Sequence, residues 1–311
     1  MGNSFIRCFG SVAAMAALCL AACGGSGMSS GSGTSTLNLG ITDSPVDGAQ
    51  KVWIQFSGVE VKPANGDAID FSFSPSRGFD LMALQGGTTA TFLNGATIPA
   101  GPYEWVRLMV DASPGSSYVI DSLGTQHDLR IPSGAETGLK LIQGFMMPAG
   151  GVANFTVDFV LSKSVIAPPG QSPDFMLKPV LRLVDNAQVG TVSGKIQTAA
   201  LGSPQTNCGT HPPVIYLFPG SGVTPDDIYV PDSGTPPAVQ PLVTTTATLD
   251  ASSMYAYTIA FVPAGTYTVA LTCDSDDPAV DETVLVPPTL VFTSYPQDVM
   301  VTNNMTSTVN F

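Results

Sequence analysis

The chain has 311 residues and a formal net charge of −13 at pH 7, with 11% charged and 44% hydrophobic residues. So acidic a chain lacks the Lys/Arg surface that a phosphate backbone requires, which excludes nucleic acid as a partner. The same charge argues against electrostatic adhesion to anionic lipid headgroups. Few charges together with 32 Gly and 26 Pro residues indicate β-structure outside the cytoplasm, and the length suits two domains better than one.

Residues 1–22 have the three parts of a secretory signal: Arg7 as the only charge, an apolar stretch from Val12 to Ala22, and small residues before a cut. The apolar stretch is too short for a membrane span of ~20 residues. Leu20-Ala21-Ala22-Cys23 resembles the lipobox of bacterial lipoproteins. The resemblance implies cleavage before Cys23 and addition of lipid, including palmitate, to that residue. The alternative is an ordinary signal peptide cut near Ala22.

Residues 23–36 follow as the lipidated Cys23 and a Gly/Ser-rich tether, which we expect to be a flexible coil with a root-mean-square span of roughly 20 Å. Two acyl chains anchor a protein stably where one chain does not. Gly24 stands where an Asp would favour retention at the inner membrane in enterobacterial lipoproteins. By that resemblance, we expect an extracytoplasmic protein attached by its lipid to the outer membrane.

Five cysteines occur in the chain. Cys8 and Cys19 leave with the signal and Cys23 receives lipid, so Cys208 and Cys273 remain as an even pair. An oxidising compartment favours a disulfide between them. It would close a loop of about 65 residues and contribute a model-dependent ~4 kcal/mol. Two buried free thiols are the alternative.

Alternating apolar residues predict the strands of a first domain, residues 37–186. Gly58 interrupts the alternation of the second strand, which predicts a bulge. Pro179 marks the last strand as an edge strand. A short helix is expected near residues 80–84. The predicted strands cover residues 37–41, 51–62, 103–111, 152–160 and 177–184.

Several stretches of this domain resemble the domain of unknown function 4382 family, whose bacterial members are typically carried by lipoproteins. The resemblance runs in the family's order through ITDSPVDGAQKVWIQFSGVEVKP (41–63), IPAGPYEWVRLMVDA (98–112), IPSGAETGLKLI (131–142), VDFVLSKSV (157–165) and LKPVLRLV (177–184). It implies a β-rich extracytoplasmic domain with no known activity. Val160 stands where the family usually has an Asp, so any role of that carboxylate is in doubt here.

Two sets of residues in this domain suggest binding. Asp43, Asp47, Asp80 and Asp158 supply the hard oxygens that Ca²⁺ prefers, but they lack the close spacing of a dedicated loop, and turn caps are the main interpretation. Trp53 and Trp105 alternate with inward-facing residues. Outward aromatic rings on a strand can bind sugars or cover a second core. Packing over a second core is the favoured interpretation here.

Residues 189–311 show a second series of short strands separated by turns, which predicts another β-sandwich. Its VSG opening, the FVPAGTYTVAL turn and the closing TVNF resemble carboxypeptidase-regulatory-like, transthyretin-like domains. Residues 255–262 and 266–272 are expected to pair around Pro263-Ala264-Gly265. The Pro-Ala-Gly sequence also occurs at residues 99–101 and 148–150, where it indicates shared turn chemistry.

The acidic run 274–282 could hold Ca²⁺, although a solvated loop beside the disulfide is the main interpretation. Its candidate ligands are Asp274, Asp276, Asp277 and Asp281. Residues 219–241 are rich in Pro and Gly, which predicts a long irregular loop.

The sequence offers no catalytic site and no cofactor. After residue 36 there is no G-x-S-x-G, and the two histidines, His127 and His211, lie in different predicted domains without a metal-ligand pattern. We therefore expect an all-β protein, two sandwiches behind a signal peptide and tether, with a non-catalytic binding or adhesion role toward a glycan or an envelope protein. A purely structural envelope component is an alternative, and a carboxylate-dependent hydrolase is the weakest one.

Overall fold

The computed structural model describes residues 33–44, 49–132, 137–166, 174–197, 212–226, 239–252, 254–273 and 295–311, together with residues 201, 208, 291 and 292. The chain divides into two compact units, Met1–Ser32 and Gly33–Phe311, and all described residues belong to the second. Within them, no helix combines the length and the apolar character needed to cross a membrane.

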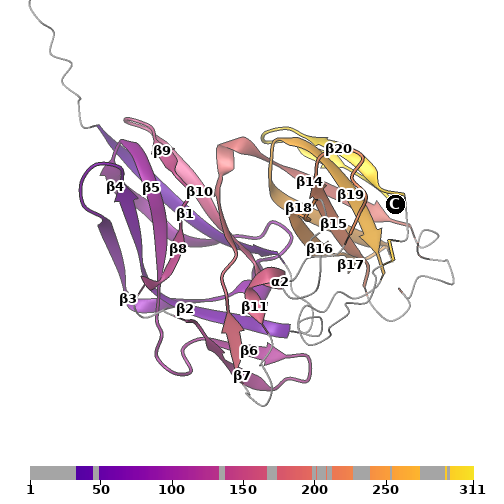
Figure 1. Ribbon diagram of the computed structural model, residues 1–311, viewed down its shortest axis with the longest axis horizontal. Helices are drawn as coiled ribbons and strands as arrows, with labels where there is room; N and C mark the ends of the chain where they lie inside the picture. Colours follow the sequence, from indigo (N-terminus) through magenta and orange to yellow (C-terminus); the bar gives the residue numbers. More distant parts are fainter. Residues whose placement is uncertain are drawn as a thin grey trace, which may run out of the picture. The chain divides into compact units, whose positions relative to one another are not determined.

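Two sheets form the first sandwich (Figure 1). Sheet I has the order β13 (Leu181–Asp185), β10 (Val152–Val160), β1 (Thr34–Ser44), β4 (Ala90–Pro99). Sheet II has the order β11 (Val165–Ile166), β12 (Phe175–Leu177), β7 (Gln126–Arg130), β6 (Tyr118–Asp121), β2 (Ala49–Pro63), β5 (Gly101–Val110), β8 (Leu139–Leu141), with β3 (Ile69–Asp80) beside β2 and β9 (Phe145–Met147) beside β5. The short helical elements here are η1 (Leu81–Leu84) and α2 (Leu161–Ser164).

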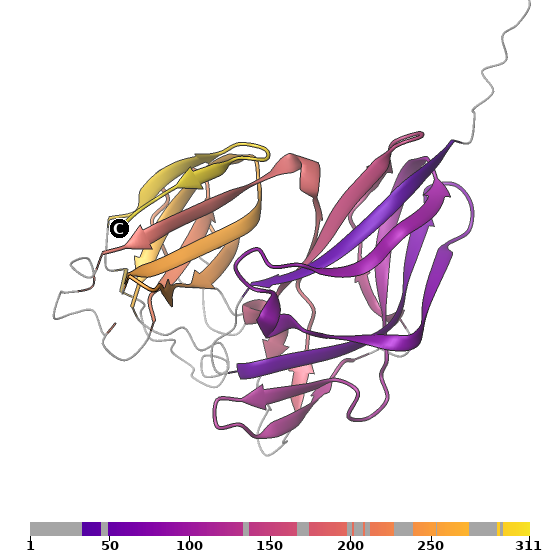
Figure 2. The same cartoon turned by 180° about the vertical axis from the view of Figure 1, so that it is seen from behind.

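Two further sheets form the second sandwich (Figure 2). Sheet III has the order β17 (Thr248–Leu249), β18 (Tyr255–Pro263), β14 (Val189–Ile196), β21 (Thr306–Thr308). Sheet IV has the order β16 (Val243–Thr246), β15 (Val214–Pro219), β19 (Gly265–Thr272), β20 (Gln297–Val301). The all-β sandwich fold expected from the sequence is therefore confirmed. Strands β1–β13 and β14–β21 share no sheet, and η2 (Asn186–Gln188) lies between the two sets. The division into domains at 37–186 and 189–311, and the transthyretin-like resemblance of the second, stay predictions.

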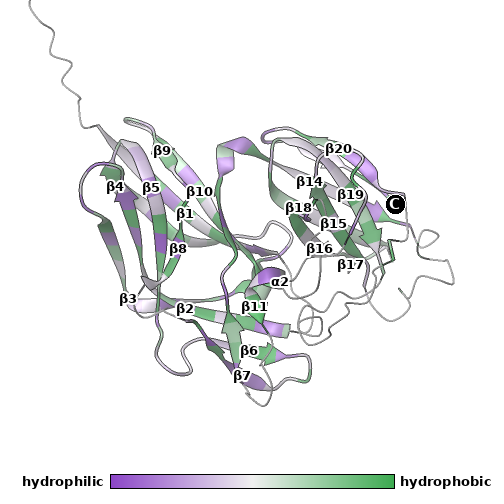
Figure 3. Cartoon of the chain, viewed as in Figure 1, coloured by the Kyte–Doolittle hydropathy of each residue, from purple (hydrophilic) through white to green (hydrophobic). Residues whose placement is uncertain are grey.

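Alternating burial along strands such as β2 and β5 builds part of the cores, whereas β15 and β19 are buried almost throughout. Figure 3 shows the hydropathy of the residues along the strands. In β2, Val52, Ile54 and Phe56 are fully buried, and burial resumes at Val59. The change of parity is a bulge: the pairing of β2 with β3 and with β5 shifts between Phe56 and Gly58. A Cβ on Gly58 would lie 2.6 Å from the Phe71 carbonyl oxygen, so the bulge predicted at this glycine is confirmed together with its reason.

Each Pro-Ala-Gly sequence carries the chain from one sheet to the other sheet of its sandwich. Residues 99–101 join β4 of sheet I to β5 of sheet II, and residues 148–150 join β9 of sheet II to β10 of sheet I. Residues 263–265 join β18 of sheet III to β19 of sheet IV. The expected pairing of residues 255–262 with 266–272 is therefore wrong, because the turn is an arch between sheets and not a hairpin.

Two of these arches are each stabilised by a hydrogen bond from a tyrosine hydroxyl. The Tyr103 hydroxyl donates to the Pro99 carbonyl oxygen at 2.9 Å, and the Tyr267 hydroxyl donates to the Pro263 carbonyl oxygen at 2.8 Å. Both side chains are buried, and burial raises the pKa of each phenol above its usual value. The hydroxyl therefore keeps its proton and its role as a donor.

The strand predicted at residues 177–184 is in fact two strands. β12 ends at Leu177 in sheet II, and β13 begins at Leu181 in sheet I. Pro179 lies between them, where it has no N–H to donate to a ladder. β13 lies at the edge of its sheet, as expected, whereas β12 lies between β11 and β7. The short helix expected near residues 80–84 is confirmed as η1.

We predict that Tyr267→Phe lowers the free energy of unfolding by about 1 kcal/mol, because the Pro263 carbonyl oxygen loses the donor of a part-buried hydrogen bond. Urea titration followed by circular dichroism measures the change. Tyr295→Phe is the matched control, since that side chain is 92% exposed. Equal stability of the two variants would refute the bracing role.

Candidate functional site

Trp53 lies in a row of residues on the outward face of sheet II. Its ring is nearly parallel to that of Tyr118, with the centroids 6.2 Å apart and the planes at 17°. The indole lies over Gly78 of β3, where an added Cβ would come within 2.0 Å of Cζ2. The Lys51 ammonium approaches to 5.3 Å of the ring centroid. Trp53 and Tyr118 are both partly exposed, so together they offer a two-ring apolar platform on the sheet.

A cleft of about 540 Å³ lies close to this platform: Trp53 and Tyr118 do not line it, but Asp128, which is paired with Tyr118, does. Its size is within the range of small-molecule sites. It lies between the β5–β6 loop, β7 with the residues that follow it, and the start of β12. The lining residues are Asp111, Ala112, Ser113, Pro114, Gly115, Ser116, Ser117, Asp128, Leu129, Arg130, Ile131, Pro132, Asp174 and Met176.

Strand register connects the platform to the cleft. Trp53 is paired with Tyr118, and Tyr118 is paired with Asp128. Directly paired residues of neighbouring strands project from the same face of a sheet. Arg130 follows Asp128 by two residues and so shares that face, and it is paired with Met176 of β12. The outward face therefore runs from two aromatic rings to a carboxylate, a guanidinium and a thioether.

Some polar groups of the cleft hold its own loop in shape. The Asp111 carboxylate accepts a hydrogen bond from the Ser113 amide at 3.1 Å, and hydrogen bonding from Ser113 lowers the pKa of Asp111. The Ser116 hydroxyl donates to the Asp111 carbonyl oxygen at 2.6 Å, while the Ser117 hydroxyl accepts from the Gln55 amide at 3.1 Å. Asp128 and Arg130, both exposed, are the charged groups best placed to meet a ligand.

Trp105 lies elsewhere on sheet II and differs from Trp53 in its contacts. The Arg107 guanidinium lies 4.7 Å from the ring centroid and the Lys140 ammonium 4.3 Å. Arg107 also forms an ion pair with Glu60 at 2.8 Å. These cation–π contacts occupy the ring, so Trp105 is less open to a sugar than Trp53. The structure does not bring the two tryptophans together in the cleft.

The carboxylates considered for Ca²⁺ do not form a site among the described residues. No group of three or more His, Cys, Asp or Glu side chains able to hold a metal occurs there. Asp80 contacts Lys51 at 3.9 Å and makes no side-chain cap bond to η1. Asp158 is buried in the middle of β10, where Arg182 Nε donates to it at 2.9 Å. The prediction that Asp80 and Asp158 cap turns is therefore wrong, because their carboxylates contact Lys51 and Arg182 on other strands. Asp47 lies outside the described residues.

Several residues that the sequence singled out belong to parts of the chain that the structure does not describe. Cys23 and the acidic-loop candidates lie outside the described residues, as does His211. The acidic-loop candidates are Asp274, Asp276, Asp277 and Asp281. The other histidine, His127, is on β7 and not in a turn, with its Nε2 2.9 Å from the Asp121 carboxylate. That contact is the main cause that lowers the pKa of Asp121.

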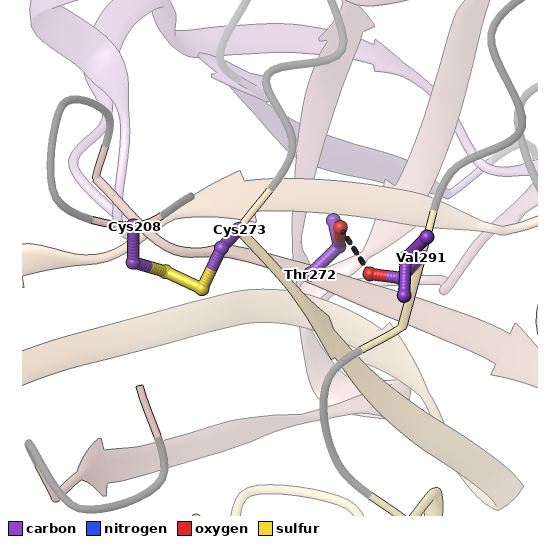
Figure 4. The surroundings of a disulfide bond; sticks show 4 residues. All are labelled: Cys208, Thr272, Cys273 and Val291. Atoms are coloured by element: carbon purple, nitrogen blue, oxygen red, sulfur yellow. Dashed lines mark hydrogen bonds between the residues drawn. A yellow bond between two sulfur atoms is a disulfide. The ribbon is translucent and has the colours of Figure 1, made fainter. Parts of the chain in front are cut away.

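The structure joins Cys208 to Cys273, as predicted, with their Cα atoms 4.6 Å apart (Figure 4). Both residues are buried. Next to Cys273, the Thr272 hydroxyl donates to the Val291 carbonyl oxygen at 3.0 Å. The disulfide therefore ties the end of β19 to a segment 65 residues earlier in the chain.

The sequence reasoning missed the cleft and Tyr118. The three parts of the cleft are separated along the chain, and only strand pairing brings them together. Trp53 was the single residue of this region that the sequence singled out. The sequence feature that points to this region is the turn at Pro114-Gly115 before a short apolar strand. That feature predicts a loop but not a ligand site.

The family model described as a domain of unknown function, DUF4382, matches residues 34–179. The match covers just under half of the chain and confirms the resemblance found in the first domain. No curated protein matches the chain.

Solved structures resemble the chain only distantly. A leucine-rich repeat protein from Bacteroides thetaiotaomicron VPI-5482 has 14% identity and a TM-score of 0.26, with 90% of this chain and 26% of that chain covered. The Bacillus anthracis TIE protein has 11% identity and a TM-score of 0.19, with 89% and 34% covered. The chain thus spans about a quarter and a third of their lengths. GBS52, the minor pilin of Streptococcus agalactiae, has 10% identity and a TM-score of 0.19, with 88% and 94% covered. Scores this low say nothing about what this chain does.

We predict that Arg182→Met destabilises the first sandwich by about 3–5 kcal/mol at pH 7, because it leaves the buried Asp158 carboxylate unpaired. Burial already raises the pKa of Asp158, and Arg182 opposes that rise. Loss of Arg182 therefore raises the folded-state pKa further. The protonated folded form is then favoured, so the penalty is fully present above the folded-state pKa and shrinks as pH falls from there toward the lower unfolded-state pKa.

Thermal unfolding between pH 4 and pH 8 measures this dependence. Arg182→Met/Asp158→Leu is the control, because removing both partners leaves no buried charge. A penalty in Arg182→Met that is independent of pH would contradict the assignment.

Proposed function

We propose that this protein is a lipid-anchored component of a bacterial cell envelope that binds a glycan without cleaving it. The observation that carries the proposal is the Trp53–Tyr118 platform beside the cleft. Aromatic rings stack on the apolar faces of sugar rings, while carboxylates accept hydrogen bonds from hydroxyl groups and guanidinium groups donate them. Asp128 and Arg130 present both kinds of group at the edge of the platform.

The proposed anchor is Cys23, and its support is the lipobox-like sequence followed by the Gly/Ser tether. The outer membrane is the proposed location. A pair of cysteines joined in a disulfide fits an oxidising compartment. The DUF4382 match to residues 34–179 agrees with the resemblance from which we inferred an extracytoplasmic domain.

A non-catalytic role fits the chemistry of the cleft. Hydrolysis of a glycoside by a carboxylate pair needs one acid whose pKa is raised. The pKa of Asp111 is instead lowered by hydrogen bonding from Ser113. The described histidine, His127, contacts Asp121 and is not among the residues that line the cleft.

We predict that Trp53→Ala and Gly78→Ala each weaken glycan binding by about five-fold or more, since stacking on one aromatic ring contributes ~1 kcal/mol or more. Gly78→Ala acts indirectly, because the new methyl group displaces the indole from the sheet. A glycan array identifies ligands, and calorimetry on the mature chain measures the dissociation constants.

Trp105→Ala is the matched control, and its effect on the same ligand should be small. Thermal melts exclude unfolding as the cause of a loss. If Trp53→Ala binds as tightly as the unchanged chain, the platform is not the site. Release of free sugar from a bound glycan by the purified chain would replace the non-catalytic role by hydrolysis.

For the anchor, we predict that cells expressing the full chain incorporate labelled palmitate, and that Cys23→Ala abolishes the label. The variant should also leave the membrane fraction for the soluble envelope fraction. Signal cleavage with no lipid on the unchanged chain would show an ordinary secreted protein. Separation of inner and outer membranes by density then decides the location.

A further inference from the structure

Three passes of the chain meet where the described residues begin. The Ala100 amide donates to the Gly33 carbonyl oxygen at 2.7 Å, and the Gly150 amide donates to the Thr34 carbonyl oxygen at 2.9 Å. Two of the arches between sheets I and II therefore flank the start of β1, which Figures 1 and 2 show beside β9. We call residues 33–36, 99–102 and 146–152 the tether end of the first sandwich.

The tether end is free of charge in a chain that is otherwise strongly acidic. The longer segments that contain it, residues 33–42, 81–103 and 141–157, have no Asp, Glu, Lys or Arg, although the chain has 24 acidic residues. Charged side chains flank it at its rim. Glu104 and Lys140 border these segments in the sequence, and the turn that contains Asp67 reaches the rim where the Ala64 amide donates to the Pro102 carbonyl oxygen at 2.9 Å.

Large apolar side chains are exposed at the tether end. Met146 is 63% exposed and Val152 is 59% exposed, on either side of the arch at residues 148–150. Ile142, 82% exposed, lies further along the same edge of sheet II. Pro102, Pro148 and Ala149 are also exposed. An exposed apolar patch framed by polar residues is the usual mark of an interaction surface.

We propose that the tether end rests on the surface of the lipid bilayer to which Cys23 attaches the chain. This inference depends on the anchor proposed above. Residues 24–33 separate the lipidated residue from the start of β1, and a Gly/Ser-rich chain of that length has a root-mean-square span of about 18 Å. β1 has 11 residues and is therefore about 36 Å long. The tether thus keeps this end of the sandwich near the surface and leaves the opposite end beyond its usual reach.

The charge distribution favours the same orientation. An anionic membrane surface repels acidic groups over a distance of about 8 Å at physiological salt. A charge-free end meets little of that repulsion, while the acidic remainder of the chain stays further out. Met146 and Val152 enter the headgroup region as apolar side chains, so the contact should depend little on salt. Such a contact is weak alone, but a short tether supplies an effective concentration of the order of millimolar.

Fluorescence quenching on the lipidated full-length mature chain tests this contact. With Cys23 lipidated and Cys208 paired with Cys273, Met146→Cys introduces a single free thiol for an environment-sensitive fluorophore. The chain is reconstituted into phosphatidylcholine–phosphatidylglycerol vesicles that contain nitroxide-labelled lipids. Leu123→Cys is the matched control, because Leu123 is 89% exposed and follows β6, which pairs with the start of β2, whereas the end of β2 pairs with β5 beside the tether end. We expect a blue-shifted emission and several-fold stronger quenching at position 146 than at position 123.

A second variant separates apolar contact from simple proximity. Met146→Asp/Val152→Asp changes two exposed side chains, so the fold should be retained, and a fluorophore on Ile142→Cys then reports on the contact. We expect its quenching to fall to the level of the Leu123 control, while glycan binding at Trp53 stays unchanged. Unaltered quenching in the double variant would overturn the proposal.

The remaining outcomes are also decisive. Vesicle flotation without preferential quenching at position 146 overturns the contact and leaves the anchor intact. Failure to float removes the anchor and the contact together, but not the glycan site. Cross-linking of position 146 to an envelope protein in cells, without quenching by lipids, would show that a protein covers this end.

Discussion

The two faces of β2 impose different roles on neighbouring residues of the first sandwich. Val52, Ile54 and Phe56 are buried between sheets I and II, so the residues between them project outward. At the bulge at Gly58 the parity changes, so that Val59 and Val61 face the core on the rest of the strand. Trp53 therefore projects from the outward face as a consequence of core packing, and everything that the platform can bind depends on that register.

The arches between sheets are the second constraint. A sandwich needs its chain to cross from one sheet to the other, and three crossings here use the same Pro-Ala-Gly sequence. Proline restricts φ before the crossing, and Gly101 and Gly150 adopt positive φ after it. Two of the crossings are held by a tyrosine hydroxyl on the proline carbonyl. The same solution in both sandwiches shows that it answers a common geometric need.

The uncharged end of the first sandwich and the proposed binding surface lie at different places on it. The uncharged tether end lies where β1 begins, while the Trp53 platform lies next to the cleft formed by the β5–β6 loop and β7. Two cations of the first sandwich form ion pairs, Arg107 with Glu60 and Arg182 with the buried Asp158. Loss of Arg182 would leave the buried Asp158 charge uncompensated, which is costly.

Much of the fold could be predicted because its signals are local. Alternation of apolar residues, the bulge at Gly58 and the short helix at residues 81–84 follow from backbone sterics and from burial of one strand face. The disulfide partners followed from counting cysteines in an oxidising compartment. The expected hairpin at residues 263–265 was wrong because a turn sequence defines local dihedral angles, whereas the choice between hairpin and arch depends on which sheet receives the next strand.

What the sequence by itself determined is the strand pattern, the outward position of Trp53, the pairing of Cys208 with Cys273 and the absence of charge from three segments. Only the tertiary structure decided that those three segments meet at one end, that Trp53 lies over Gly78 beside Tyr118, and that a cleft opens next to them. The physical reason is that side-chain alternation is a property of one strand. Register and sheet order join residues far apart in the chain, and they are set by packing of the whole core.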